Sequence, residues 1–123
     1  MKKEFTYYDS APPVHECILY CGMPRHTVRV DISEIAADEH PPFTHRAREV
    51  TLPEGVWGYD ALVSALVKAR YDDDRMMAVI NNHLDKPDDV EISAEWNDMQ
   101  QWRREAKTLA KQIIANYNGN GNG

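Results

Sequence analysis

The spacing of hydrophobic residues changes once along the chain, from every second position to every third or fourth. Up to about residue 52, apolar residues alternate with polar ones, as in the strands of a half-buried sheet. From about residue 59 they recur at the spacing of amphipathic helices. The pattern predicts an α+β fold, in which a small antiparallel sheet of about three strands precedes three helices.

Three segments of the first half have the alternation of strands. Residues 14–21 are apolar on both faces, which predicts the more buried strand. Residues 27–32 alternate cleanly, and the turn formers Gly22 and Pro24 precede them, so a hairpin with a loop of four to six residues is expected. Its core positions are Val28, Val30 and Ile32, and its solvent positions are Thr27, Arg29 and Asp31. Residues 48–52 form the third strand.

Helices are predicted over residues 59–71, over residues 72–84 and, longest, over residues 88–117. An aspartate among residues 72–74 caps the second helix, and Ser33 is expected to cap one short turn earlier in the chain. The expected organisation is an N-terminal extension (1–13), a single domain (14–117) and a flexible Gly/Asn tail (118–123).

The third helix carries an apolar stripe with two tryptophans. At about 1.5 Å per residue it is about 40 Å long, more than the diameter of a domain of this size. Two interpretations follow. Either Trp96 and Met99 pack on the domain core, or the later half of the helix docks on a second copy or another protein. The candidate interaction residues are Trp96, Met99, Trp102, Arg103, Leu109, Ile113 and Tyr117.

The charge of the chain argues against nucleic acid and membranes as partners. The formal net charge of −6 repels phosphates and anionic lipids. A basic row on the third helix is the local exception, but acidic residues occupy the first half of the same helix. The row consists of Arg103, Arg104, Lys107 and Lys111. No apolar run approaches the ~20 residues that cross a bilayer.

One group of residues has the types that bind zinc: His15, Cys17, Cys21 and His26. A strand, however, places Cys17 and Cys21 about 13 Å apart at ~3.3 Å per residue, too far for one metal ion or for a disulfide. We therefore expect two reduced thiols and no metal or other cofactor. A small zinc-stabilised regulatory or nucleic-acid-binding module remains the alternative.

Catalysis has weaker support. His40 and His45 flank a Pro-Pro-Phe-Thr loop beside two acidic residues, which leaves an enzyme with a histidine loop as a second alternative. Ser33, Ser64 and Ser93 stand in no recognisable nucleophile motif. We expect a protein without enzymatic activity. The first residues lack the apolar region of a secretory signal, so a location inside a cell, or in a particle assembled there, is expected.

Between Arg48 and Lys107 the chain contains TLPEG, YDALVSALV, a helix with an NN-L pattern and MQQWRREAK. In these features it resembles small uncharacterised proteins encoded in phages and prophages of gut bacteria. The resemblance implies a virion-associated protein, a tail-region accessory protein or an assembly factor. It carries over no catalytic residue, and it says little about the N-terminal hairpin.

Overall fold

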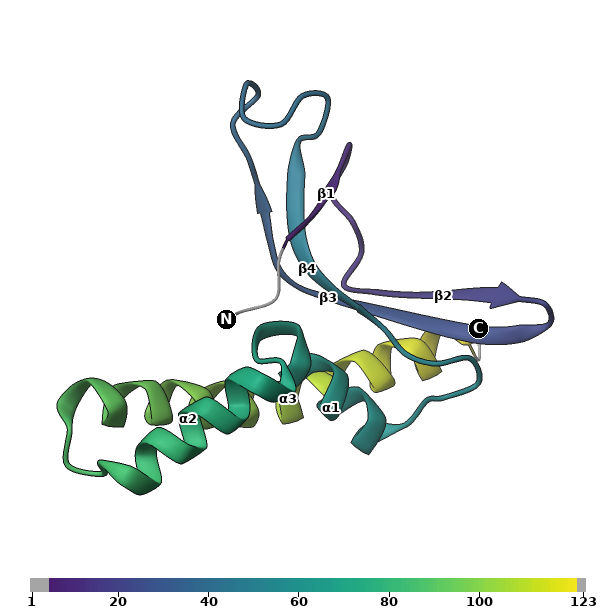
Figure 1. Cartoon of the computed structure of the whole chain (residues 1–123). Helices are drawn as coiled ribbons and strands as arrows, with labels where there is room; N and C mark the ends of the chain where they lie inside the picture. The colour runs from purple at the N-terminus through teal and green to yellow at the C-terminus, as the bar shows by residue number, and fades with distance from the viewer. Residues whose placement is uncertain (1–4, 122–123) are drawn as a thin grey trace.

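A four-stranded antiparallel sheet and three helices form the two layers of the fold (Figure 1). The computed structural model describes residues 5–121. The strands are β1 (Thr6–Tyr8), β2 (His15–Tyr20), β3 (Met23–Glu34) and β4 (His45–Thr51), in the spatial order β1-β4-β3-β2. The α+β class and the antiparallel sheet are confirmed, but the sheet has four strands rather than three.

The additional strand, β1, comes from the expected N-terminal extension. It pairs antiparallel with β4, with Tyr7 opposite Arg46. The ring of Phe5 anchors it, because the guanidinium groups of Arg46 and Arg48 each lie 4.0 Å from the ring centroid. The later part of residues 1–13 therefore belongs to the domain, and residues 1–4 lie outside the described residues.

The hairpin between β2 and β3 has a two-residue turn, so the predicted four-to-six-residue loop is wrong. Cys21 and Gly22 both have positive φ, at 53° and 83°. Turns of this kind match the right-handed twist of the two strands and let the pairing continue to the turn, where Tyr20 faces Met23. The turn carries Cys21 to the exposed tip of the hairpin.

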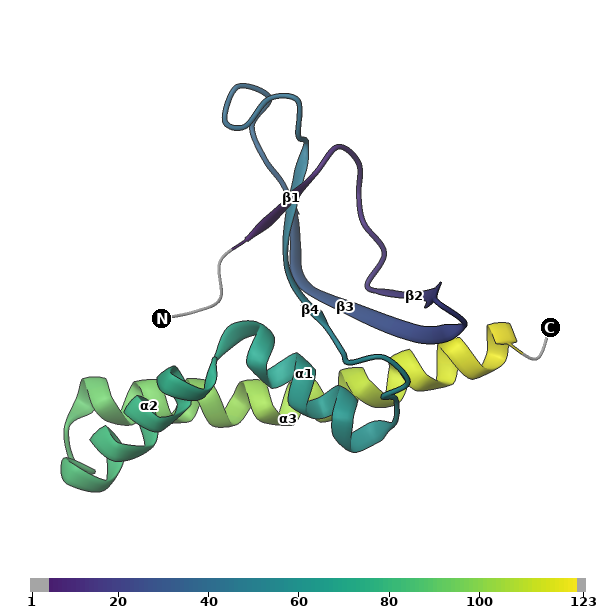
Figure 2. The ribbon, with the colours of Figure 1, turned by 45° about the vertical axis from the view of Figure 1, so that its right-hand side comes forward.

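A bulge in β3 bends the sheet. The register with β4 shifts between Val30 and Ser33, and Asp31 has a φ of 56°. The first part of β3 lies over the helices, whereas its last part rises away from them together with β1 (Figures 1 and 2). The predicted cap at Ser33 is therefore wrong. Ile32, expected in the core, is only half-buried because the bulge interrupts the alternation.

Asp31 joins the bulge to the helices. It was expected to face solvent, but it accepts hydrogen bonds from Arg48 at 2.7 Å and from Arg70 of the first helix at 2.6 and 3.1 Å. Burial opposes the charge of this carboxylate, but the bonds from Arg70 and Arg48 outweigh it and hold the pKa of Asp31 below its ordinary value.

We predict that Asp31→Asn lowers the free energy of unfolding by about 2 kcal/mol, because it removes charge-assisted hydrogen bonds while keeping a residue that tolerates positive φ. Asp73→Asn is the matched control. Its 4.0 Å pair with Lys68 is largely exposed, so a loss below about 0.5 kcal/mol is expected. Urea unfolding of both variants tests this. Equal losses would mean that the Asp31 pairs contribute nothing special.

Arg29 is the second residue whose predicted exposure is wrong. Its side chain is buried on the sheet face opposite the helices, where it donates to the Glu49 carboxylate at 2.8 Å and to the Glu16 carboxylate at 2.9 Å. The carbonyl of Pro13 and the hydroxyl of Tyr8 accept further bonds from it. The segment from β1 to Pro13 covers this face, which explains the burial of a charged side chain that is fully paired.

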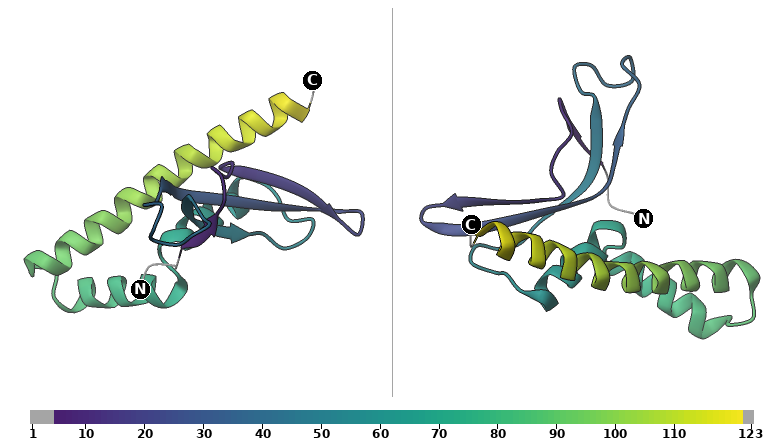
Figure 3. Two further views of the ribbon diagram at one scale, coloured as in Figure 1. Left: turned by 90° about the horizontal axis from the view of Figure 1, so that it is seen from above. Right: turned by 180° about the vertical axis from the view of Figure 1, so that it is seen from behind.

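The helices are α1 (Tyr59–Arg70), α2 (Asp73–Asp85) and α3 (Val90–Gly121). Asp72 caps α2, because its carboxylate accepts a bond from the Arg75 amide at 2.7 Å. Residues 118–121, expected in the flexible tail, belong to α3, and residues 122–123 lie outside the described residues. Figure 3 shows α3 running the full length of the helical layer, with α1 and α2 side by side with it. Within residues 5–121, no helix has the length and apolar character needed to span a membrane.

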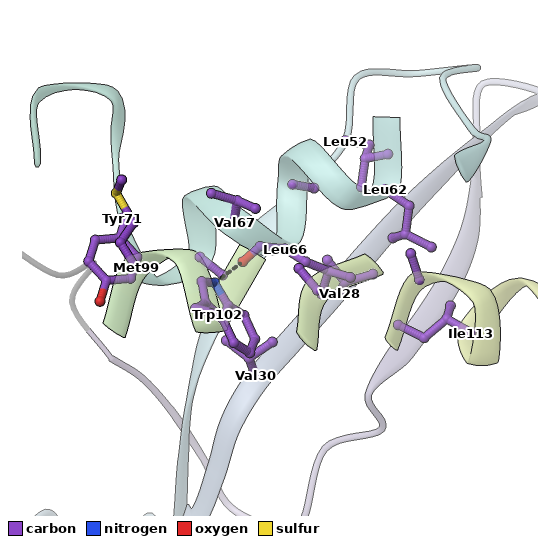
Figure 4. Packing of buried hydrophobic residues seen from close by; sticks show 14 of the residues in the cluster. Val28, Val30, Leu52, Leu62, Leu66, Val67, Tyr71, Met99, Trp102 and Ile113 are labelled. Carbon is purple, nitrogen blue, oxygen red and sulfur yellow. Dashed lines mark hydrogen bonds between the residues drawn. The ribbon is translucent and has the colours of Figure 1, made fainter. Parts of the chain in front are cut away.

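The core lies between the first part of the sheet and the helices (Figure 4). Trp102 of α3 sits at its centre, and its indole N–H donates to the carbonyl oxygen of Leu66 at 3.1 Å. The guanidinium of Arg70 covers the ring at 3.9 Å. The side chains packed around it include Val28, Val30, Leu62, Leu66, Met99, Ala106 and Ile113. The helical stripe seen in the sequence is thus mainly core.

Candidate functional site

The predicted docking residues separate into three groups. Met99, Trp102 and Ile113 are 0%, 5% and 4% exposed, because α1 and the sheet cover this stripe of α3. Burial leaves these three little surface for a partner. Trp96 also packs within the chain, stacked on His83 of α2 with the ring centroids 4.2 Å apart. The length of α3 therefore reflects the combined length of the elements that pack along it, and not a projecting half.

Arg103 lies elsewhere, beside a hollow of about 480 Å³ between the three helices. Val63, Met76 and Ile80 supply apolar walls, and Lys107 stands one turn beyond Arg103. Acidic residues at the first turns of α1 and α2 also line it. This surface combines charged groups of both signs with apolar groups.

Leu109, Ile113 and Tyr117 line a groove of about 450 Å³ between α3 and β2. The other side of this groove, which we call the β2–α3 groove, consists of Val14 and the strand residues His15 and Cys17; Gln112 and Asn116 complete it. Seen from above, the last turns of α3 run out on the β2 side of the sheet (Figure 3, left). A smaller hollow of about 300 Å³ shares Val14 and Leu109 with the groove.

β2 forms one edge of the sheet, and in the described part of the chain it pairs with β3 alone. The Arg29 amide donates to the Val14 carbonyl at 2.8 Å, which fixes the direction of the backbone groups. Because these groups alternate in direction along an antiparallel strand, those of His15, Cys17 and Leu19 point to the open edge. Leu19 is also 73% exposed, so the edge combines unpaired backbone groups with apolar surface.

Four polar side chains form a chain of contacts that begins at the groove and continues beneath it, to the buried His26. His15 Nε2 lies 2.9 Å from His26 Nδ1, and His26 Nε2 lies 3.8 Å from Cys17 Sγ. The hydroxyl of Tyr117 lies beside the same thiol, which raises the pKa of Tyr117. Trp57 stacks on the two imidazoles, with centroid distances of 3.9 Å to His26 and 4.8 Å to His15. Strands, a loop and a helix thus meet around the two imidazoles and the thiol, and we call this the Cys17–histidine cluster.

Burial governs the protonation of the two histidines. His26 is 2% exposed, and burial lowers its pKa below the ordinary value of 6.5. Burial also lowers the pKa of His15, and the neighbouring His26 lowers it further, against a smaller opposing effect of Glu16. Both rings are therefore neutral near pH 7. With the His26 proton on Nδ1, that N–H donates to His15 Nε2 and leaves His26 Nε2 as an acceptor for the thiol.

The residues of the zinc alternative come together only in part. His15, Cys17 and His26 meet in the cluster, but the turn places Cys21 at the hairpin tip. Among residues 5–121, no three His, Cys, Asp or Glu side chains have an arrangement able to hold a metal ion. In the Cys17–histidine cluster, His26 directs Nδ1 at His15 and Nε2 at Cys17. The three side chains therefore contact one another and do not point at one common position.

The histidine loop proposed for catalysis contains two separate contacts. His40 packs on the ring of Tyr7 with a centroid distance of 4.2 Å. His45 contacts the hydroxyl of Thr44 at 2.8 Å and the carboxylate of Glu34 at 3.9 Å. These contacts do not bring the two imidazoles to one reacting atom.

Sequence reasoning missed Trp57 and the open edge of β2. Trp57 stands in a loop, where no periodicity marks a buried side, although a tryptophan between two glycines after a turn is a sign that a ring packs back on the domain. The order of strands is a tertiary property that alternation does not encode. Comparison of the chain with protein-family models, with curated proteins and with solved structures finds no match.

Proposed function

We propose that the chain is a non-enzymatic structural or accessory protein of a phage or prophage, and that it acts by docking an extended segment of another protein in the β2–α3 groove. The observation that carries this proposal is the open edge of β2 beside a cavity lined by α3. The proposal keeps the docking role predicted for Leu109 and Tyr117 and moves it from a helix surface to a groove.

The chemistry of the edge favours an extended segment as the occupant. The outward N–H and C=O groups of His15, Cys17 and Leu19 need partners at the spacing of a strand ladder, which a helix cannot offer because its backbone groups are paired internally. A strand added between an edge strand and a helix directs alternate side chains into the groove. Val14 and Leu109 offer apolar contacts there, so alternate apolar residues are expected in the partner.

The genomic context rests on the resemblance between Arg48–Lys107 and phage and prophage proteins. A virion-associated protein, a tail-region protein or an assembly factor needs protein contacts rather than catalysis. The net charge of −6 is consistent with a protein partner, since it repels nucleic acid.

Site-specific photo-cross-linking in prophage-induced cells tests the proposal. A benzophenone side chain replaces Leu19 at the strand edge or, as the control, Leu84 on α2, which has the same exposure of about three quarters. The proposal predicts an adduct from position 19 with a phage-encoded protein, through a segment with alternating apolar residues, and none from position 84. Equal adducts from both positions would contradict it.

We further predict that Leu19→Pro abolishes this docking, because proline removes an N–H that points to the open edge and blocks the ladder there. Leu19→Ala is the matched control. This variant loses most of the side chain but keeps the N–H. It should therefore weaken binding by about tenfold or less, which corresponds to about 1.4 kcal/mol of binding free energy. Affinity of each variant for the cross-linked segment, measured by calorimetry, decides between backbone and side-chain recognition. Equal losses in the two variants would remove the strand-addition argument.

A second copy of the chain is the competing occupant, since two β2 edges can pair across a two-fold axis. Native mass spectrometry of the purified chain separates the two cases. The proposal predicts a monomer whose groove is open to a foreign segment. A dimer that Leu19→Pro dissociates would assign the edge to self-association instead.

A further inference from the structure

The Cys17–histidine cluster has the parts of a nucleophilic thiol site. We propose that Cys17 reacts with low-molecular-weight disulfides by thiol–disulfide exchange, with His26 as the acceptor of the thiol proton. Cys17 lines the β2–α3 groove and is partly exposed, so a small molecule in the groove lies beside it. The reaction is a stoichiometric modification and needs no catalytic turnover.

The contacts supply a path for the proton. His26 Nε2 faces the thiol at 3.8 Å, a distance that shortens as a reactant approaches in sites of this kind. Nδ1 of the same ring is held by His15 at 2.9 Å, which fixes the orientation and shares the positive charge that arrives with the proton. The face of Trp57 lies 3.9 Å from His26 and favours the same charged state.

Tyr117 completes the site from α3. Its hydroxyl lies beside the Cys17 thiol, and a hydrogen bond that it donates during the reaction stabilises the developing negative charge on sulfur. The neighbouring thiol raises the pKa of Tyr117, so this phenol stays protonated and is available as a donor. The neutral state of His26 at pH 7 agrees with this role, because a base must be unprotonated to accept a proton.

The exchange balances with one disulfide as co-reactant. The thiol proton moves to His26 Nε2 while the Cys17 sulfur attacks one sulfur of the small disulfide. The S–S bond of that molecule breaks, and a mixed disulfide forms on Cys17. The departing thiolate takes the proton from His26, so the products are the modified chain and one free thiol. Oxidising equivalents come from the small disulfide alone.

Cys21 provides an internal control, because it lies exposed at the hairpin tip and outside the cluster. Two single-thiol variants of the full chain, Cys21→Ser and Cys17→Ser, are treated with oxidised glutathione, and the adduct is followed by intact mass. The proposal predicts that Cys17, although less exposed, reacts about tenfold faster than Cys21. This factor is smaller than the rate acceleration that a positioned general base usually gives. In urea the two rates should become equal.

Two further variants separate chemistry from packing. Tyr117→Phe keeps the ring and removes only the hydroxyl, so it should slow the reaction of Cys17 severalfold and leave Cys21 unchanged. His26→Gln should remove the acceleration and leave a rate of Cys17 that rises with pH near neutrality as the rate of Cys21 does, because attack then depends on the thiolate fraction alone. The proposal is overturned if Cys17 in the folded chain reacts no faster than Cys21, or if Tyr117→Phe leaves its rate unchanged.

Modification of Cys17 also regulates the docking groove, an extension that rests on the proposed function. A glutathione adduct fills part of a cavity of about 450 Å³ and stands beside the outward backbone groups of β2. The glutathionylated chain should therefore fail to bind the segment that the reduced chain binds. Adduct formation without loss of binding would contradict this coupling alone. Absence of binding by the reduced chain would count against the proposed function, while the thiol kinetics, which need no partner, stand separately.

Discussion

Replacement of Trp102 by alanine is expected to lower the free energy of unfolding by about 4 kcal/mol, the usual cost of emptying a buried indole site. The side chain is 5% exposed, and its N–H bond to the Leu66 carbonyl disappears as well. Arg70 would lose the ring that it covers. The effect is large because Trp102 connects α3, α1 and the bend of the sheet at one point.

Trp96→Ala is the control for this prediction. Trp96 belongs to the same helix but is only half-buried, and its main ring contact is His83 on the neighbouring helix. We expect a loss of about 1–2 kcal/mol, in proportion to the smaller apolar area that it buries. Urea unfolding followed by circular dichroism measures both. Equal stability of the two variants would show that Trp102 is not a core residue and would return it to the list of docking candidates.

Acid is expected to destabilise the domain in two separate steps. The first begins below pH 6.5, the ordinary pKa of histidine, because folding lowers the pKa of both His15 and His26. The unfolded chain then binds more protons than the folded one, so stability is complete above pH 6.5 and falls as the pH falls. The pair cannot accept two protons without losing its 2.9 Å N···N contact. Glu16 opposes the shift at His15, and Cys17 and Tyr117 are the remaining titratable neighbours.

The second step is due to Asp31 and lies below pH 3.8. Folding lowers the pKa of this carboxyl, so the unfolded chain binds a proton there at a higher pH than the folded chain does, and stability falls as the pH falls. Thermal unfolding between pH 7 and pH 3 should therefore show two declines. The double variant His15→Gln, His26→Gln should lose the first decline and keep the second. If that variant keeps the same decline below pH 6.5, the histidine pair is not its source.

The sequence predicted those elements of the fold in which apolar side chains recur at a regular spacing. The helices appear as stripes around Leu62, Val79 and Trp102, and the alternation of Val28 and Val30 marks β3. β1 was missed because three residues are too few to display a period. The tight turn was missed because cysteine seldom adopts the positive φ that Cys21 has.

The β2–α3 groove could not be predicted from the spacing of residues in the sequence. Leu109 and Tyr117 were named from their place on a helix, yet their partner is the edge of a strand some ninety residues earlier in the chain, which only the strand order reveals. The sequence offered His15, Cys17 and His26, together with Cys21, only as a zinc alternative. The hairpin register, with Cys17 opposite His26, shows instead why the thiol and the imidazole are neighbours.

The proposed docking of an extended segment has a distinctive signature in amide hydrogen exchange. The measurement compares the reduced chain alone with the reduced chain bound to a synthetic peptide. The peptide has the sequence of the partner segment that cross-links to position 19. Strand addition predicts slower exchange at the amides of Cys17 and Leu19, which point outward, and no change at Glu16 and Ile18, which already face β3. Unchanged exchange at Cys17 and Leu19, or protection confined to the hollow between the three helices, would contradict the account.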